Sequence, residues 1–119
     1  VLQPNIRLTG AAYWDFVDKP TIARLYPEGF AGWDIEHGGV LETSLMLALY
    51  PDQVHLDRAI DHPPAKFPPY DVYPPHQEWT PASGTLSSPK ASSREKGEIL
   101  LEVCTRGIVG ALRNEFPAA

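Results

Sequence analysis

The sequence predicts an α/β protein built as a single domain. Apolar residues alternate around Arg7 as they do in a strand, whereas two later segments carry apolar residues at helical spacing. Strand-like and helix-like segments that follow one another are typical of α/β architecture. The chain has 119 residues, which is enough for one hydrophobic core but not for two.

The first predicted elements are a strand and a short helix. Ile6 and Leu8 flank Arg7 in a strand-like pattern within residues 1–18, and an aromatic segment around Trp14 follows as a loop or edge strand. Pro20 suits the first turn of a helix because the N–H group that proline lacks is unused there. This helix ends before Pro27 and Gly29.

The second segment, AGWDIEHGGVLETSLMLALYP, joins a polar loop to an apolar helix. Gly39 is the expected N-cap, and Glu42 in the first turn places a negative charge at the positive end of the helix dipole. Pro51 ends the helix. One apolar stripe follows from the helical spacing of Leu41, Leu45, Ala48 and Leu49.

Residues 61–88 contain three Pro-Pro pairs interleaved with aromatic residues. Proline removes backbone donors and fixes φ, so this segment favours neither a helix nor a central strand. Disordered linkers are usually poor in aromatic residues. The segment therefore predicts an ordered, extended arm that lays its rings on a neighbouring surface of this subunit or of another.

The last segment predicts a long helix. Ser92 and Glu95 have the spacing of a capping box, and Pro117 marks the end. The apolar stripe consists of Leu100, Cys104, Ile108 and Leu112 at intervals of four residues. Cys104 is the only cysteine, and its place in this stripe favours a buried, inert thiol.

Charge and hydropathy exclude two classes of partner. The formal net charge is -5, which is unfavourable for a surface that follows nucleic-acid phosphates. No apolar run approaches the roughly 18 residues that a membrane-spanning helix needs. We therefore expect a cytoplasmic protein that binds neither nucleic acid nor a membrane.

The segment Trp33–His37 has two alternative interpretations. His37 can accept and donate a proton near neutral pH, Asp34 and Glu36 lie close enough to orient it, and the Trp33 indole offers a flat wall for a planar ligand. Gly38 and Gly39 would let the backbone approach a ligand at a helix N-terminus. The alternative is an ordinary polar loop between two buried elements.

The spacing of histidines and carboxylates gives no metal motif. The chain has no H-E-x-x-H sequence, and His55, His62 and His76 are scattered. A catalytic zinc site takes about three protein ligands. We therefore expect no metal ion on this chain alone.

The blocks WDIEHGG and ETSLML, together with YWDFV upstream and GTLSSPKASSREKGEILLEVC downstream, resemble the C-terminal half of the creatininase family. The resemblance covers nearly the whole chain, so residues 1–119 are expected to be the C-terminal portion of one creatininase-like domain. It implies a three-layer α/β/α sandwich with a mostly parallel sheet, homo-oligomers (hexamers in creatininase itself), and interconversion of creatinine and creatine. It also implies two divalent ions, zinc or manganese, in the complete enzyme.

The resemblance also implies roles for individual residues. His37 matches a catalytic residue that contacts substrate and moves a proton, and Glu36 matches an acid that supports it. Trp33 and Asp34 match substrate-binding residues, and Trp14 matches a mobile aromatic that closes over the substrate. Glu42 lies near the family's metals, as a ligand or as a buttress.

The family's metal-binding motifs are absent from this sequence. There is no E-x-H, and Asn5 and Asn114 do not begin an N-G-H segment. The main hypothesis is a creatininase whose metal-holding half is missing from this chain, so that the chain by itself is inactive. The alternatives are a related amidohydrolase that acts on another small amide, and an inactive fragment or interaction module.

Overall fold

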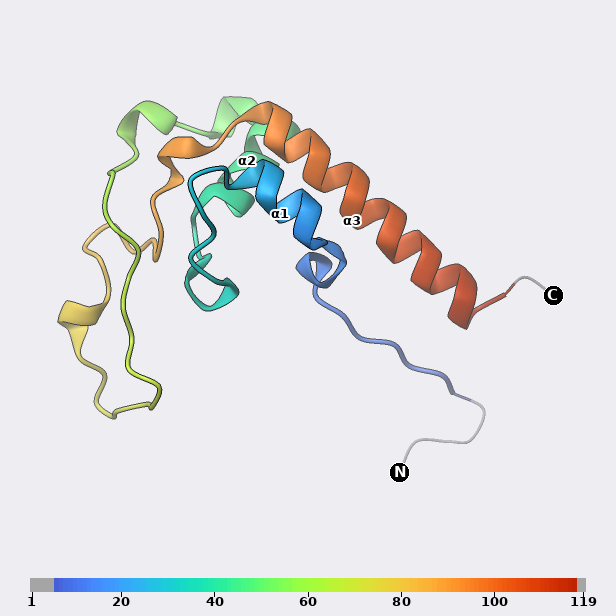
Figure 1. Ribbon diagram of the computed structural model, residues 1–119, viewed down its shortest axis with the longest axis horizontal. Coiled ribbons are helices and arrows are strands. Elements are labelled where there is room, and N and C mark those ends of the chain that lie inside the picture. The colour runs from blue at the N-terminus through green and yellow to red at the C-terminus, as the bar shows by residue number, and fades with distance from the viewer. Residues whose placement is uncertain (1–5, 118–119) are drawn as a thin grey trace.

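The computed structural model describes residues 6–117 and is built around three α-helices (Figure 1). They are α1 (Lys19–Leu25), α2 (Val40–Leu49) and α3 (Arg94–Glu115). Short 3-10 helices lie between them, at Tyr13–Phe16, Trp33–Ile35, Pro51–Gln53, Leu56–Arg58, Gln77–Trp79 and Pro89–Ala91. None of the helices in the described range is long and apolar enough to cross a membrane.

The predicted α/β class, with its three-layer α/β/α sandwich and mostly parallel sheet, is wrong for this chain. Residues 6–117 contain no strand. A strand is stable only when its backbone N–H and C=O groups pair with a neighbouring strand. Residues 6–12 meet no such partner, and Ile6 and Leu8 are mostly exposed. The remainder of that predicted strand, residues 1–5, lies outside the described residues.

The first helix forms as its sequence predicts. The Asp18 carboxylate accepts a hydrogen bond from the Thr21 N–H at 2.8 Å, and Pro20 occupies the first turn. The aromatic segment before α1, which was predicted as loop or edge strand, is a 3-10 helix at Tyr13–Phe16. Its residue Phe16 packs on Gly107 of α3, where a Cβ atom would lie 2.6 Å from the Phe16 ring.

Helices α2 and α3 cross closely at two small residues. A Cβ atom on Gly97 would lie 2.0 Å from the backbone oxygen of Ser44, so only glycine permits this approach. Ser44 is fully buried, and its hydroxyl accepts a hydrogen bond from the Ser93 N–H at 3.2 Å. The core around the crossing consists of Val17, Leu25, Leu41, Leu100 and Cys104.

The start of α3 differs by one residue from the prediction. The N-cap is Ser93, whose hydroxyl accepts from the Lys96 N–H at 3.2 Å. The Ser92 hydroxyl donates instead to the Val40 carbonyl oxygen at 3.4 Å. Only the first half of the predicted apolar stripe is buried: Leu100 and Cys104 lie in the core, but Leu112 is 49% exposed.

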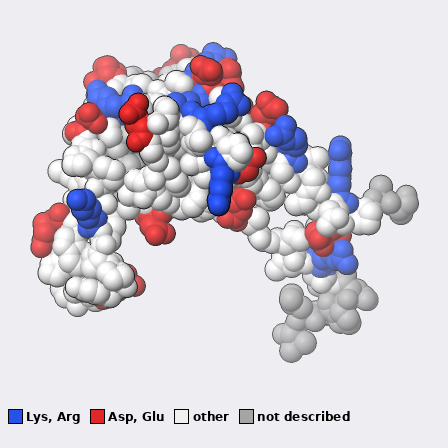
Figure 2. Space-filling view, viewed as in Figure 1, with Lys and Arg blue, Asp and Glu red and all other residues white. Residues whose placement is uncertain are grey.

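The Pro-rich arm, residues 61–88, extends away from the three helices and returns to them (Figure 1). Hydrogen bonds close its base, from Ala65 N–H to the Leu86 carbonyl at 2.8 Å and from the Ser88 hydroxyl to Asp61 Oδ1 at 2.6 Å. Tyr73 is 90% exposed, and uncharged side chains form most of the visible surface of the arm (Figure 2).

Candidate functional site

The loop between α1 and α2 carries four of the predicted site residues. Trp33 and Asp34 lie in the 3-10 helix Trp33–Ile35, and Glu36 and His37 follow it. The Trp33 ring is held against Phe30 in an edge-on arrangement, with ring centroids 4.8 Å apart, and is 37% exposed. One part of the indole is thus fixed by the protein while the remainder stays accessible.

A small cavity brings the two predicted tryptophans together. It has a volume of about 60 Å³ and is lined by Tyr13, Trp14, Trp33, Glu36, Leu41 and Glu42. Trp14 and Trp33 are 19 positions apart in the sequence and come from different 3-10 helices. The fold therefore places both indole rings on the wall of one cavity.

Tyr13 is a residue of this cavity that the sequence analysis missed. Its ring packs edge-on against Trp14 at a centroid distance of 5.0 Å. Burial, with the negative charges of Glu42 and Glu36 adding to it, raises the pKa of Tyr13 to about 12. The phenol therefore stays protonated at neutral pH and is available as a hydrogen-bond donor. The adjacent Tyr-Trp pair was the available sequence signal.

Glu36 lies at the centre of the site and is mostly buried. Its carboxylate accepts from the Leu41 N–H at 2.7 Å and from the Ser87 hydroxyl at 3.2 Å. Burial raises the pKa of Glu36, with the charge of Glu42 acting in the same direction, while these hydrogen bonds oppose the shift. Both hydrogen bonds join Glu36 to the scaffold, so the support of His37 that was predicted for it would pass through the backbone.

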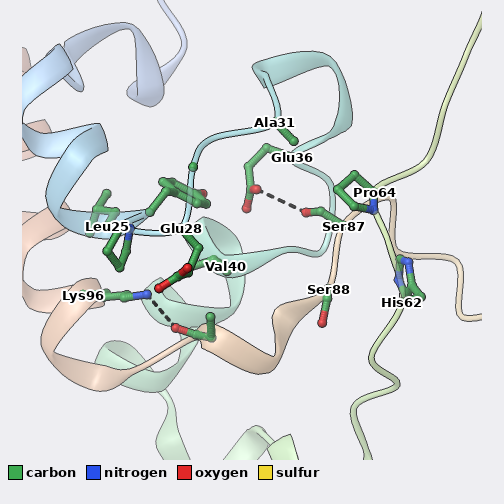
Figure 3. A pocket seen from close by; sticks show the side chains of 14 residues that line it. Leu25, Glu28, Ala31, Glu36, Val40, His62, Pro64, Ser87, Ser88 and Lys96 are labelled. Atoms are coloured by element: carbon green, nitrogen blue, oxygen red, sulfur yellow. Dashed lines mark hydrogen bonds between the residues drawn. The ribbon is translucent and has the colours of Figure 1, made fainter.

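Glu36 also lines a second cavity, of about 200 Å³ (Figure 3). The walls of this cavity are mainly apolar, and Lys96 lies at one end with its ammonium group bonded to the Ala91 carbonyl at 2.7 Å. The Tyr26 hydroxyl is buried without a hydrogen-bond partner among the described residues. Burial and the neighbouring Glu36 charge raise the pKa of Tyr26 well above its ordinary value.

The imidazole of His37 is exposed, at the end of the loop that carries Trp33. It is not packed in an apolar interior, and it is not among the residues that line the 60 Å³ cavity. The His37 backbone is fixed, because its carbonyl oxygen accepts from the Leu86 N–H at 2.9 Å. Asp34 is also exposed and makes no side-chain hydrogen bond within the described residues.

The two glycines after His37 serve the fold of the chain itself. A Cβ atom on Gly38 would lie 2.7 Å from Thr85 Cγ2, and one on Gly39 would lie 2.1 Å from Ser87 Oγ. The predicted close approach therefore occurs between two segments of the protein. The N-terminus of α2 is also partly occupied, because Glu36 accepts the Leu41 N–H and Glu42 accepts the Gly38 N–H at 2.5 Å.

The cavity and its loop present an aromatic surface, an exposed imidazole and two carboxylates, but no metal cluster among residues 6–117. Among residues 6–117, no three His, Cys, Asp or Glu side chains lie close enough together to hold a metal ion. Glu36 and Glu42 share the small cavity without a histidine beside them. The described residues therefore do not fit a metal centre by themselves.

Comparisons with known proteins identify the family of this chain. The family model of creatininase, described as creatinine amidohydrolase, matches residues 9–112. The chain therefore belongs to the creatininase family.

The relatives are more than twice as long as the matched part. Creatinine amidohydrolase of Pseudomonas putida is 70% identical over 114 residues, which make up 95% of this chain and 44% of that protein. A manganese form of creatininase has 69% identity and a TM-score of 0.88 over 91% of this chain and 42% of its own. A creatininase mutant complexed with creatine matches with 69% identity and a TM-score of 0.87, over 91% and 43%.

Proposed function

We propose that this chain is the C-terminal portion of a creatininase that interconverts creatinine and creatine. The observation that supports this most directly is the convergence of Trp14 and Trp33 on one cavity beside Glu36. The relatives named creatinine amidohydrolase and creatininase, one of them complexed with creatine, support the choice of substrate. In this proposal the chain supplies substrate-binding residues and the residue that transfers a proton.

Each predicted site residue has a part in this reaction. Trp33 stacks on the planar ring of creatinine, Asp34 binds its polar edge, and Trp14 closes the opening and limits access of water. Hydrolysis breaks the ring amide C–N bond: the oxygen of a water molecule ends on the carbonyl carbon, and a proton must reach the ring nitrogen that leaves. His37 delivers that proton as a general acid.

Glu36 acts on His37 by positioning. Its carboxylate bonds to the Leu41 N–H and the Ser87 hydroxyl, so it fixes the turn that follows His37.

The proposed reaction also requires divalent ions, which the described residues do not bind by themselves. The relatives include a manganese form and a form with two zinc ions. Residues 6–117 offer no ligand set for such ions. We therefore assign the ions to polypeptide beyond the matched segment, within the homo-oligomer that the family resemblance implies.

The test is a chimera, defined as the Pseudomonas putida creatinine amidohydrolase in which the matched 114 residues are replaced by those of this chain. In the chimera, His37→Ala is expected to lower kcat for creatinine by about 10²–10⁴, the usual contribution of general acid–base catalysis. The matched control is His55→Ala, which removes an exposed histidine outside the site and should leave kcat unchanged.

A loss of less than about threefold in H37A, equal to that in H55A, would contradict the role of His37. A panel of other small cyclic amides, assayed with the same chimera, tests the substrate. Faster turnover of another amide than of creatinine would favour the alternative amidohydrolase.

A further inference from the structure

The return segment of the Pro-rich arm, Thr85–Ser87, packs directly against the loop that carries His37. The Leu86 N–H donates to the His37 carbonyl oxygen at 2.9 Å, and the Ser87 hydroxyl donates to Glu36 Oε2 at 3.2 Å. Figure 3 shows the Glu36 and Ser87 side chains pointing toward one another. Glu36 and Ser87 are 51 positions apart in the sequence, so this contact belongs to the tertiary structure.

The glycines of the loop make this contact possible. Gly38 has a backbone φ angle of +64°, which residues other than glycine rarely adopt. The Thr85 side chain fills the space beside it. Gly39 is buried against the Ser87 hydroxyl. The arm thus occupies the positions that side chains would take at both glycines, and a shift of Ser87 would be transmitted to this turn.

The other side of the return segment is anchored independently. The His62 ring bonds through Nε2 to the Thr85 hydroxyl at 2.8 Å, and the Ser88 hydroxyl donates to Asp61 at 2.6 Å. Ser87 is buried, whereas Ser88 points away from Glu36 (Figure 3). The two adjacent serines therefore hold different structures: Ser87 holds the site loop, and Ser88 holds the base of the arm.

We propose that Ser87 is a positioning residue for His37. Its hydroxyl keeps the Glu36 carboxylate in the orientation that accepts the Leu41 N–H, and the Leu86–His37 bond fixes the backbone next to it. Together they set the direction from which the imidazole reaches the substrate. This inference rests on the proposed function for the role of His37, and Ser87 itself does not contact substrate.

The test compares two alanine variants in the chimera. S87A is expected to lower kcat for creatinine about tenfold and to leave KM within about twofold, because a misplaced proton donor weakens the transition state more than substrate binding. S88A removes a hydroxyl one position away and should leave both constants unchanged. A purely structural Ser87 would instead give S87A the same kcat as S88A, and that result overturns the proposal.

A second measurement does not depend on activity. Hydrogen–deuterium exchange of the chimera should show faster exchange over residues 33–42 in S87A, and in S88A only around the base of the arm. If the unsubstituted chimera does not hydrolyse creatinine, the proposed function fails, and this measurement still tests whether Ser87 holds the loop that carries His37. Equal exchange over residues 33–42 in S87A and the unsubstituted protein would overturn it.

The replacement Ser87→Cys covers the case in which S87A does not fold. It is nearly isosteric with serine and is only a weak donor. It should show the same selective loss of kcat, and full kcat in a folded S87C variant would contradict the proposal.

Discussion

At the scale of single residues, the site depends on one mostly buried carboxylate. Glu36 lines both cavities and joins the loop before α2 to the end of the arm. Glu36 was predictable as a site residue from its place beside His37 in the sequence, whereas Ser87 was not. A hydroxyl 51 positions away has no local pattern that reveals its partner, because only the folded arm brings the two together.

The titration of Glu36 gives a prediction for stability. Burial raises the pKa of Glu36 above its ordinary value of 4.5, so the folded chain holds this proton more tightly than the unfolded chain does. The resulting stability is present below the unfolded pKa and is lost as pH rises through the folded pKa. Glu36→Gln stays neutral and keeps an oxygen for the Leu41 N–H. The free energy of unfolding of E36Q minus that of the unsubstituted chain should therefore increase from about pH 4 to about pH 7.

Urea unfolding at several pH values measures this difference. The matched control is Glu102→Gln, which removes one negative charge at an exposed position on α3. If the difference in unfolding free energy between E36Q and the unsubstituted chain stays level or falls as pH rises, burial does not raise the pKa of the Glu36 carboxyl.

At the scale of elements, the helices were predictable and the sheet was not. Proline and capping residues mark the ends of helices locally, so the predicted bounds hold to within about a residue, including the shift of the α3 cap from Ser92 to Ser93. A strand depends on a partner that the local sequence does not contain. The alternation around Arg7 therefore predicted a strand where the structure has none.

The crossing of α2 and α3 gives a prediction with an internal control. Gly97→Ala places a methyl group against the backbone of Ser44, so the helices must separate, and we expect a loss of about 1–3 kcal/mol in the free energy of unfolding. Gly110→Ala, on the same helix, adds a methyl group that meets nothing within 4 Å. It should gain up to about 1 kcal/mol from helix propensity.

Chemical denaturation of both variants measures these values in the 119-residue chain. Equal effects of the same sign in G97A and G110A would mean that the two helices do not pack at Gly97 as the structure has them.

At the scale of the whole molecule, the chain is open. Its radius of gyration is 17.4 Å, whereas a compact domain of this length has about 13.5 Å. The arm and the end of α3 extend from the small core, and Leu112 and Phe116 on that end are about half exposed. The relatives of known structure share this part at TM-scores near 0.88 and are more than twice as long. Exposed apolar residues of this kind commonly mark surfaces that contact other polypeptide.

Our proposal assigns substrate binding and proton transfer to this chain, and metal binding to polypeptide beyond it. The described residues bring aromatic walls and two carboxylates to one cavity, with His37 exposed outside it, and they form no group of three metal ligands. Trp33 and His37 were predictable from the sequence because they lie in one short segment, but the geometry that joins this segment to the arm was not.

The most direct test compares the isolated 119-residue chain with the chimera, each incubated with zinc or manganese and assayed for creatine formed from creatinine. We predict turnover by the chimera, and neither bound metal nor turnover for the isolated chain. Hydrolysis of creatinine by the isolated chain, or a folded and metal-loaded chimera that forms no creatine, would contradict the account.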